Sequence, residues 1–266
     1  FVASSAAVLE PSSLSMSNGS DLKLNTHQAD ILFIGTNELL SAAEKLIEHR
    51  RSQGFAVAKA SVEDIANEFG MGYVNPQAIK DFIDHVYASW MSPAVKYVVI
   101  LGDGTVDPKG RLGGSVKNIV PIKLVKGLYW DYASDFWYVK DDGTGYPRAA
   151  VGRIPATSAA EMQVYADKVI AFESGDRAPA ADQSNRIVIV SDEDQYGGEH
   201  FDAKSDQLES TILTLRPEAA VTKIRKSQLS SAQAKTEILN SFSDGPLVMH
   251  YIGHGAEDMW SDSSVF

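Results

Sequence analysis

Cysteine is absent from the 266 residues of this sequence. Its absence excludes disulfide bonds, zinc sites with thiolate ligands and a thiol nucleophile supplied by the chain itself. It does not indicate the compartment, because an α/β domain of this length can bury enough apolar surface without disulfides.

Positive charge is also scarce. The chain carries 24 Lys and Arg against 35 Asp and Glu, a formal net charge of −11. This balance disfavours nucleic acid as a partner, because such binding depends on basic surfaces that displace counterions from phosphates. Apolar runs are short and none approaches the roughly 18 residues that a membrane span needs. The chain starts at Phe1, so we expect any signal peptide to lie outside it.

Short apolar runs alternate with segments of helical periodicity. Runs at residues 31–34, 55–58, 97–101, 187–190, 221–224 and 247–252 predict strands. Helices are predicted between them, for example after Asn75-Pro76, which supplies a cap and a first-turn proline. Strands that alternate with helices predict parallel-rich sheets flanked by helices on both faces, the α/β class.

Two stretches lack this periodicity and predict the domain organisation. Residues 1–26 are rich in serine, and we interpret them as a linker or the end of a preceding domain. Residues 175–183 contain mostly small and polar residues and predict a boundary. We therefore expect an N-terminal α/β subdomain over residues 27–180 and an incomplete C-terminal one over residues 181–266.

The loops after predicted strands are the places where functional groups gather in such sheets. Asp103 and Asp107 follow the strand at 97–101, with Gly102 before Asp103 and Gly104 between the two carboxylates. Two carboxylates in this spacing could bind a structural Ca²⁺ ion. A tight turn in which the carboxylates accept backbone N–H groups is the favoured interpretation.

A second loop carries adjacent carboxylates and a third carries histidines. Residues 191–194 are Ser-Asp-Glu-Asp and follow the strand at 187–190. One carboxylate could stabilise an imidazolium, although spacing alone favours a solvated acidic loop.

His254 lies between glycines at the end of the last strand, where its ring could act as a general base and the Gly255 amide could face an oxyanion. A structural role for His254 stays equally open, and we expect His250 to be a core histidine.

Five motifs in a fixed order carry a resemblance to a known family. They are Asn75-Pro76-Gln77-Ala78-Ile79-Lys80-Asp81-Phe82-Ile83, Lys96-Tyr97-Val98-Val99-Ile100-Leu101-Gly102-Asp103, Ser134-Asp135-Phe136-Trp137-Tyr138, Ala150-Val151-Gly152-Arg153-Ile154-Pro155 and Tyr251-Ile252-Gly253-His254-Gly255. Each motif alone is weak, but in this order they resemble the gingipain-type (C25) cysteine peptidases over roughly residues 28–260.

The resemblance implies a caspase-like α/β fold in two stacked subdomains, the second of which holds a His–Cys dyad. His254 matches the catalytic histidine, and Gly255 would donate an oxyanion-hole amide. Glu193 resembles the acid that orients the histidine. Asp206 resembles the acidic residue of the primary specificity pocket in arginine-cleaving members; the alternative is that it lies on the exposed face of the helix predicted over residues 200–215.

The resemblance also implies a nucleophilic cysteine after the next strand, beyond Phe266. We therefore expect the complete protein to which this chain would belong, called the parent below, to be a secreted or cell-surface cysteine endopeptidase that acts on polypeptides. We expect this chain to be inactive without the C-terminal remainder of the parent. The alternative is a non-catalytic gingipain-like module for binding or secretion. A nucleotide-binding domain is disfavoured, because residues 35–38 lack the glycine-rich fingerprint and no phosphate-binding loop motif occurs.

Overall fold

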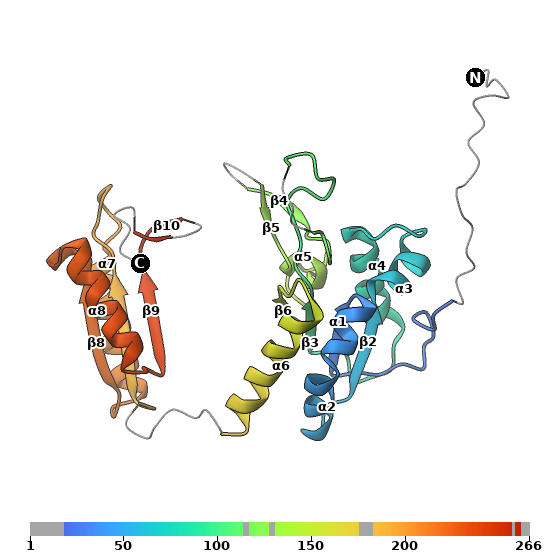
Figure 1. The fold of residues 1–266 in the computed structure, drawn as a ribbon, viewed down its shortest axis with the longest axis horizontal. Helices are drawn as coiled ribbons and strands as arrows, with labels where there is room; N and C mark the ends of the chain where they lie inside the picture. The colour runs from blue at the N-terminus through green and yellow to red at the C-terminus, as the bar shows by residue number, and fades with distance from the viewer. Residues whose placement is uncertain (1–18, 114–116, 128–130, 176–182, 257–258, 262–266) are drawn as a thin grey trace, which may run out of the picture. The chain divides into compact units, whose positions relative to one another are not determined.

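The computed structural model describes residues 19–113, 117–127, 131–175, 183–256 and 259–261. The chain divides into two compact units, Phe1–Glu173 and Ser174–Phe266 (Figure 1). Each unit has its own parallel sheet and its own helices. The boundary expected near residue 180 falls within residues 176–182, which lie outside the described residues.

The first unit is built on a four-stranded parallel sheet with the order β2-β1-β3-β6. Its strands are β1 (Ile31–Gly35), β2 (Val57–Ser61), β3 (Tyr97–Leu101) and β6 (Ala150–Ile154). The apolar runs predicted β1 and β3, and β2 begins two residues later than expected. Strand β6 was not predicted, because it lies at the edge of the sheet and its glycine and arginine interrupt the apolar pattern.

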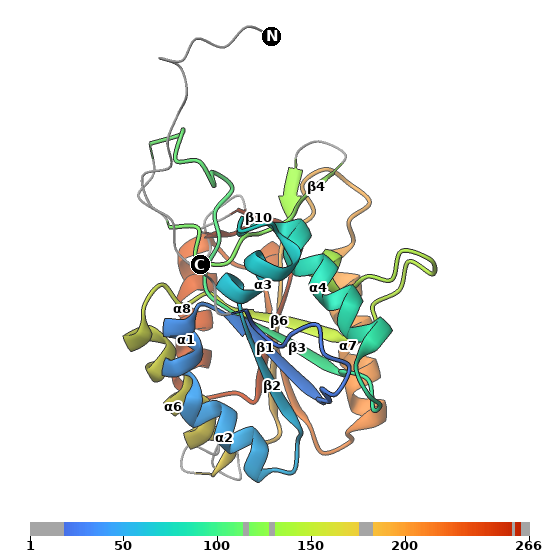
Figure 2. The same ribbon diagram turned by 90° about the vertical axis from the view of Figure 1, so that its right-hand side faces the viewer.

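Helices cover both faces of this sheet (Figure 2). Alternate strand residues such as Ile31 and Phe33 pack with helices on one side, while Leu32 and Ile34 pack with helices on the other. The first side holds α1 (Asn37–Ala42), α2 (Glu44–Ser52) and α6 (Ala159–Glu173); the second holds α3 (Val62–Phe69), α4 (Pro76–Ser89) and α5 (Phe136–Val139). A hairpin of β4 (Leu124–Lys126) and β5 (Asp131–Ala133) completes the unit.

The predicted cap of α4 is present, because the Asn75 side chain accepts a hydrogen bond from the Ala78 amide at 3.0 Å. The segment from residue 19 to 26, which we assigned to a linker, packs against this unit. Leu22 is only 5% exposed, and its carbonyl accepts a hydrogen bond from Trp90 Nε1.

Arg153 connects two of the five motifs of the sequence analysis, the one at residues 134–138 and the one at residues 150–155. Its guanidinium forms a bidentate pair with Asp135, with N···O distances of 2.7 and 2.9 Å. It also donates to the carbonyls of Gly102, Val120 and Pro121. These bonds tie the segment between β3 and β4, and the start of α5, to β6, so the motifs have a structural role in the first unit.

The second unit is built on a three-stranded parallel sheet with the order β8-β7-β9. Its strands are β7 (Arg186–Ser191), β8 (Ala220–Arg225) and β9 (Val248–Ile252). Helix α7 (Phe201–Leu215) packs on Ile187 and Ile189, and α8 (Ser231–Ser243) packs on Val188 and Val190. A 3₁₀ turn at Lys226–Gln228 follows β8, and a hairpin of β10 (Gly255–Ala256) and β11 (Met259–Trp260) follows β9.

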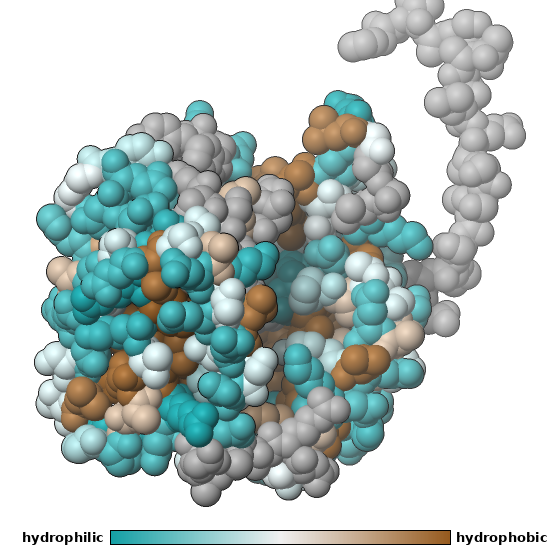
Figure 3. Space-filling model, turned by 60° about the vertical axis from the view of Figure 1, so that its left-hand side comes forward, coloured by the Kyte–Doolittle hydropathy of each residue, from teal (hydrophilic) through white to brown (hydrophobic). Residues whose placement is uncertain are grey.

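The face seen in Figure 3 is mainly hydrophilic, with separate hydrophobic patches. Among the described residues, no helix combines the length and the apolar character that crossing a membrane requires.

Candidate active site

The candidate site forms where β7 and β9 end side by side. These strands pair in parallel, with Ser191 opposite Ile252, so the loops that follow them start at the same edge of the sheet. Because of this parallel pairing, the acidic segment after β7 lies next to the Gly-His-Gly turn after β9. This agrees with the expectation that functional groups gather at the carboxyl ends of the strands.

Asp192 joins the two loops. Its side chain is almost fully buried, and its Oδ2 accepts a hydrogen bond from the His254 amide at 3.2 Å. The Tyr251 hydroxyl lies 3.1 Å from the same oxygen and 2.6 Å from the His254 carbonyl. Oδ1 accepts the Glu193 amide at 2.9 Å. The backbone of His254 is therefore held on both sides by buried polar groups.

The residue before the histidine must be small. A Cβ atom at Gly253 would lie closer than 3.0 Å to the Tyr251 hydroxyl oxygen and to Asp192 Cβ. The glycine allows the chain to turn tightly against Asp192, and this close approach sets where the His254 ring leaves the sheet.

The Gly255 amide points away from the hairpin. Ser261 N donates to the His254 carbonyl at 2.8 Å, which makes these two residues a hydrogen-bonded pair of the β10–β11 ladder. Hydrogen-bonded and non-hydrogen-bonded pairs alternate in an antiparallel ladder, so Gly255 and Trp260 form a non-hydrogen-bonded pair. In such a pair the amide faces outward, the orientation that an oxyanion donor requires.

Glu199 is the carboxylate in contact with the His254 ring. Its Oε1 pairs with Nε2 of His254, and its Oε2 accepts hydrogen bonds from the Gln195 and Tyr196 amides. The His254 hydrogen bond, followed by these two backbone bonds, lowers the pKa of the Glu199 carboxyl. The carboxylate is therefore ionised at neutral pH and opposes an imidazole that can carry a proton.

Glu193 follows β7 at the same edge but binds a different partner. Its Oε1 accepts a hydrogen bond from Lys226 Nζ at 3.1 Å, and the lysine side chain is only 9% exposed. We expected Glu193 and His254 to converge at this edge, close enough for a direct or water-mediated hydrogen bond; the hydrogen bond that the structure gives Glu193 is the one to Lys226. The role of Glu193 as the orienting acid stays a prediction.

An acidic cavity of about 520 Å³ adjoins this site. Its lining residues are Asp192, Glu193, Asp194, His200, Asp202, Ala203 and Ser227. Asp202 is fixed by two hydroxyls, since Ser191 Oγ donates to Oδ1 at 2.5 Å and Ser227 Oγ donates to Oδ2 at 2.6 Å. Four carboxylates line the cavity, and one of them, that of Glu193, is already paired with Lys226, so the excess of negative charge suits a cationic group.

Asp206 lies one turn further along α7, outside the lining of this cavity. Its carboxylate pairs with Lys223 at 2.7 Å and with Arg225. The Lys223 hydrogen bond is the main cause that lowers the pKa of Asp206. The side chain is 51% exposed. This placement matches the alternative of an exposed helix face, and a role in specificity stays a prediction.

Two other expectations concern Asp103, Asp107 and His250. Asp103 Oδ1 accepts the Gly104 amide and Asp107 Oδ2 accepts the Leu112 amide, as in the favoured tight turn. Within the described ranges, no group of three or more His, Asp or Glu side chains is arranged to hold a metal ion, and Ca²⁺ binding stays an untested prediction. His250, which we expected in the core, is exposed because β9 is an edge strand of its sheet.

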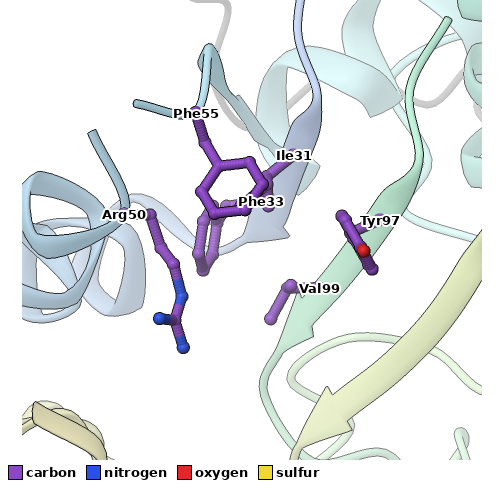
Figure 4. A pocket seen from close by; sticks show the side chains of 6 residues that line it. All are labelled: Ile31, Phe33, Arg50, Phe55, Tyr97 and Val99. Atoms are coloured by element: carbon purple, nitrogen blue, oxygen red, sulfur yellow. The ribbon is translucent and has the colours of Figure 1, made fainter. Parts of the chain in front are cut away.

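The first unit contains a separate apolar cavity of about 300 Å³ on its sheet (Figure 4). Its lining residues are Ile31, Phe33, Arg50, Phe55, Tyr97 and Val99. Arg50 is the one charged residue among them, and its guanidinium is paired with Glu173 at 2.6 and 2.8 Å. Its lining residues include no histidine and no carboxylate, so the candidate active site is the one in the second unit.

Residues 25–266 match the sequence model of peptidase family C25. The chain belongs to this family. Gingipain R2 and gingipain R1 of Porphyromonas gingivalis are each 25% identical to it over 220 residues, which is 82% of this chain. The alignments cover 26% and 20% of the two gingipains, so the chain spans about a quarter of these relatives or less.

A solved structure of a protease shares the fold of this C25 chain. It superposes with a TM-score of 0.64 at 18% sequence identity, over 87% of this chain and 46% of that one. Together with the family match, this similarity confirms the α/β, caspase-like fold class that the sequence predicted.

Sequence reasoning missed Glu199 and Asp202 in this C25 chain. Glu199 follows Gly197-Gly198, both at positive φ (75° and 83°), and the two glycines turn the loop so that the carboxylate reaches the histidine. A glycine pair before a carboxylate was the available signal. Asp202 gave no such signal, because its role in the cavity depends on serines 11 and 25 residues away in the chain.

Proposed function

We propose that this chain carries the histidine half of a cysteine endopeptidase active site, completed by a thiolate from the C-terminal remainder of the parent chain. One observation carries the proposal: the His254 ring is paired with a carboxylate directly beside a glycine amide that faces outward. A general base and an oxyanion donor in this arrangement are two of the three parts that acyl transfer by a thiol requires.

In the proposed reaction, His254 takes the proton of the cysteine thiol, and the thiolate attacks the carbonyl carbon of the scissile peptide bond. The Gly255 amide donates a hydrogen bond to the oxyanion that forms. His254 then gives its proton to the leaving amine, which breaks the C–N bond and leaves an acyl-enzyme. Water, deprotonated by the same imidazole, hydrolyses the thioester and restores the thiol.

The substrates in this proposal are polypeptides, and the acidic cavity supports a preference for a basic side chain next to the cleaved bond. A guanidinium or ammonium group in the cavity would pair with Asp202, while a neutral side chain would exclude water and leave the carboxylate, held by two serine hydroxyls, without an opposite charge, at a cost of about 2–5 kcal/mol. We propose Asp202 for this role on its place in the cavity. Asp206, to which the resemblance assigns the role, is the second candidate.

The test of the proposed activity uses the complete parent protein. We expect it to cleave peptides, to be labelled by a thiol-directed inhibitor at one cysteine, and to lose turnover in the His254→Ala variant. Cleavage that survives this substitution would place the chemistry elsewhere. A parent with serine or alanine in place of the nucleophile would support the alternative of a non-catalytic module for binding or secretion.

The test of specificity compares peptides that differ only in Arg or Leu at the position before the cleaved bond. We expect the Asp202→Asn variant of the parent to lose most of the preference for Arg, measured as the ratio of kcat/KM values, and the Asp206→Asn variant to keep it. The opposite result would assign the selection to Asp206. Secretion or display at the cell surface is also part of the proposal, and fractionation of the producing cells tests it.

A further inference from the structure

We propose that the first sheet carries a peptide-binding groove on the face that α2 and α6 cover. The groove takes an uncharged, extended peptide segment in which residue i is aromatic and residue i+2 is apolar, and Arg50 donates to a backbone carbonyl between the two side chains. The site lies within the first unit, and the proposal does not rest on the proposed peptidase function.

The groove consists of two adjoining cavities of about 300 and 240 Å³. Phe33, Arg50 and Val99 line both of them, so the cavities meet at these residues. A volume of about 150 Å³ is enough to hold benzene. Each cavity therefore has room for one apolar side chain.

The walls of the two cavities differ. In the first cavity, the rings of Phe55 and Tyr97 meet edge to face at a centroid distance of 6.3 Å, and Tyr97 is 44% exposed at the rim (Figure 4). The second cavity continues between Leu46 of α2 and two residues of α6, Tyr165 and Val169. The aromatic walls of the first cavity favour an aromatic side chain, and the second favours an aliphatic one.

One row of residues across three strands forms the floor of both cavities. Phe33 of β1 lies opposite Val99 of β3, and Val99 lies opposite Gly152 of β6. The row ends in open space, because a Cβ atom at Gly152 would meet no atom within 4 Å. Neighbouring strands are roughly 5 Å apart, and side chains on the same face of an extended peptide are roughly 7 Å apart. Residues i and i+2 of one peptide can therefore occupy the two cavities together.

Arg50 lies where the cavities meet and has hydrogen-bond donors to offer. Its Nη1 donates to Gln53 and to Glu173, and its Nη2 donates to Glu173. Within the part of the chain that the structure describes, no residue accepts from the Nε–H group or from the second Nη2–H group. These two groups lie on one edge of the planar guanidinium, where a single carbonyl oxygen can accept both.

The charge balance of the groove favours an uncharged ligand. Glu173 already neutralises the Arg50 guanidinium through two hydrogen bonds of 2.6 and 2.8 Å. A ligand carboxylate at the free edge of Arg50 would be repelled by Glu173, and a ligand cation would be repelled by Arg50. Arg153 also lines the second cavity, but its guanidinium donates to Asp135 and to three backbone carbonyls. A peptide carbonyl is thus the acceptor that suits this site.

The test is an NMR titration of the 266-residue chain with blocked, uncharged peptides. The probe is acetyl-Phe-Ser-Val-amide, and the matched controls are acetyl-Ser-Ser-Val-amide and acetyl-Phe-Ser-Ser-amide. We expect the probe to shift the signals of Tyr97, Val99 and the Arg50 Nε–H group. Each control should bind at least about 5-fold more weakly, because one cavity loses its apolar occupant. An analogue with an E-alkene in place of the amide after Phe should also bind about 5-fold more weakly and leave the Arg50 signal unshifted.

Substitutions in the floor test the placement without altering Arg50. Gly152→Leu fills the second cavity alone, so we expect it to abolish the preference for Val over Ser at the third position and to keep the preference for Phe at the first. Val99→Phe projects into both cavities and should weaken probe binding at least about 10-fold. The control is Val164→Leu, at a position of α6 that is 69% exposed and outside the lining of both cavities, and it should bind the probe as the wild type does.

Several results would overturn the proposal. These are unshifted Tyr97 and Val99 signals up to millimolar probe, equal binding of the three peptides, and wild-type preferences in Gly152→Leu. Binding of ethylbenzene as tight as that of the probe would make the groove a site for small apolar molecules. An Arg50 Nε–H signal that moves with protein concentration in the absence of peptide would assign the groove to a second copy of the chain.

Discussion

Replacement of Gly253 by alanine tests whether the tight turn before His254 is fixed by packing. The added Cβ would lie closer than 3.0 Å to the Tyr251 hydroxyl oxygen and to Asp192 Cβ. The second of these atoms is attached directly to the backbone, so it cannot move aside by a rotamer change. The Tyr251 ring must shift, which breaks its 2.6 Å contact with the His254 carbonyl.

The magnitude follows from these two effects. Overpacking of a close-packed site costs about 1–3 kcal/mol, and loss of one buried hydrogen bond costs about 0.5–1.5 kcal/mol. Alanine recovers about 0.4–1 kcal/mol by reducing the freedom of the unfolded chain. We therefore expect Gly253→Ala to destabilise the second unit by about 2 kcal/mol, roughly a 30-fold change in its opening equilibrium.

Native-state hydrogen exchange of the β7 and β9 amides measures this change without assuming that both units unfold together. The control is Gly152→Ala in β6, where an added Cβ would meet no atom within 4 Å. We expect its effect to stay within about 0.5 kcal/mol.

A double-mutant cycle identifies the atom responsible. Tyr251→Phe removes the hydroxyl that the new methyl group would meet, so we expect Gly253→Ala to cost about 1 kcal/mol less in the Tyr251→Phe background. If Gly253→Ala leaves the exchange of β7 and β9 unchanged, or if the two substitutions are strictly additive, the argument from close approach fails.

Three further predictions concern the cores, the surface charges and the activity of the chain. Ile238→Ala removes a fully buried side chain of α8 and should cost about 2–5 kcal/mol in urea unfolding of the second unit, whereas Leu239→Ala, at an adjacent position that is 47% exposed, should cost less than about 1 kcal/mol. The Arg50 hydrogen bonds are the largest cause that lowers the pKa of Glu173 to about 2, so this group stabilises the first unit fully above its ordinary pKa of 4.5 and loses that contribution as pH falls toward 2. After allowance for solvent screening, the stability difference between wild type and Glu173→Gln should shrink by about 1 kcal/mol between pH 6 and pH 2, and a constant difference would contradict the assignment. The purified 266-residue chain should show no cysteine-peptidase turnover and no labelling by thiol reagents, because it contains no cysteine; robust hydrolysis by the chain alone would contradict the proposed function.

The fold class and the edge of the sheet at which the site lies could both be predicted from the amino-acid pattern. Apolar runs such as Ile31-Leu32-Phe33-Ile34 and Tyr97-Val98-Val99-Ile100-Leu101 form strands because burial on both faces requires continuous apolar residues. The proximity of His254 to the acidic segment after β7 could be predicted, because both follow parallel strands of the same sheet. Edge elements were missed, as at β6, because partial exposure leaves no continuous apolar run.

Which carboxylate binds which partner depends on the packing of elements that are distant in the chain. Glu193 and Glu199 are chemically equivalent and six residues apart, and the glycine pair before Glu199 indicates a turn without identifying which partner its carboxylate meets. Their partners come from other elements: Lys226 follows β8, and His254 follows β9. Likewise, Asp202 and Asp206 lie one turn apart on α7, yet Asp202 meets two serine hydroxyls in the cavity and Asp206 meets Lys223 and Arg225 outside it. Charge pairing acts over a few ångströms in space, so residues distant in the chain determine it, and local sequence cannot encode the outcome.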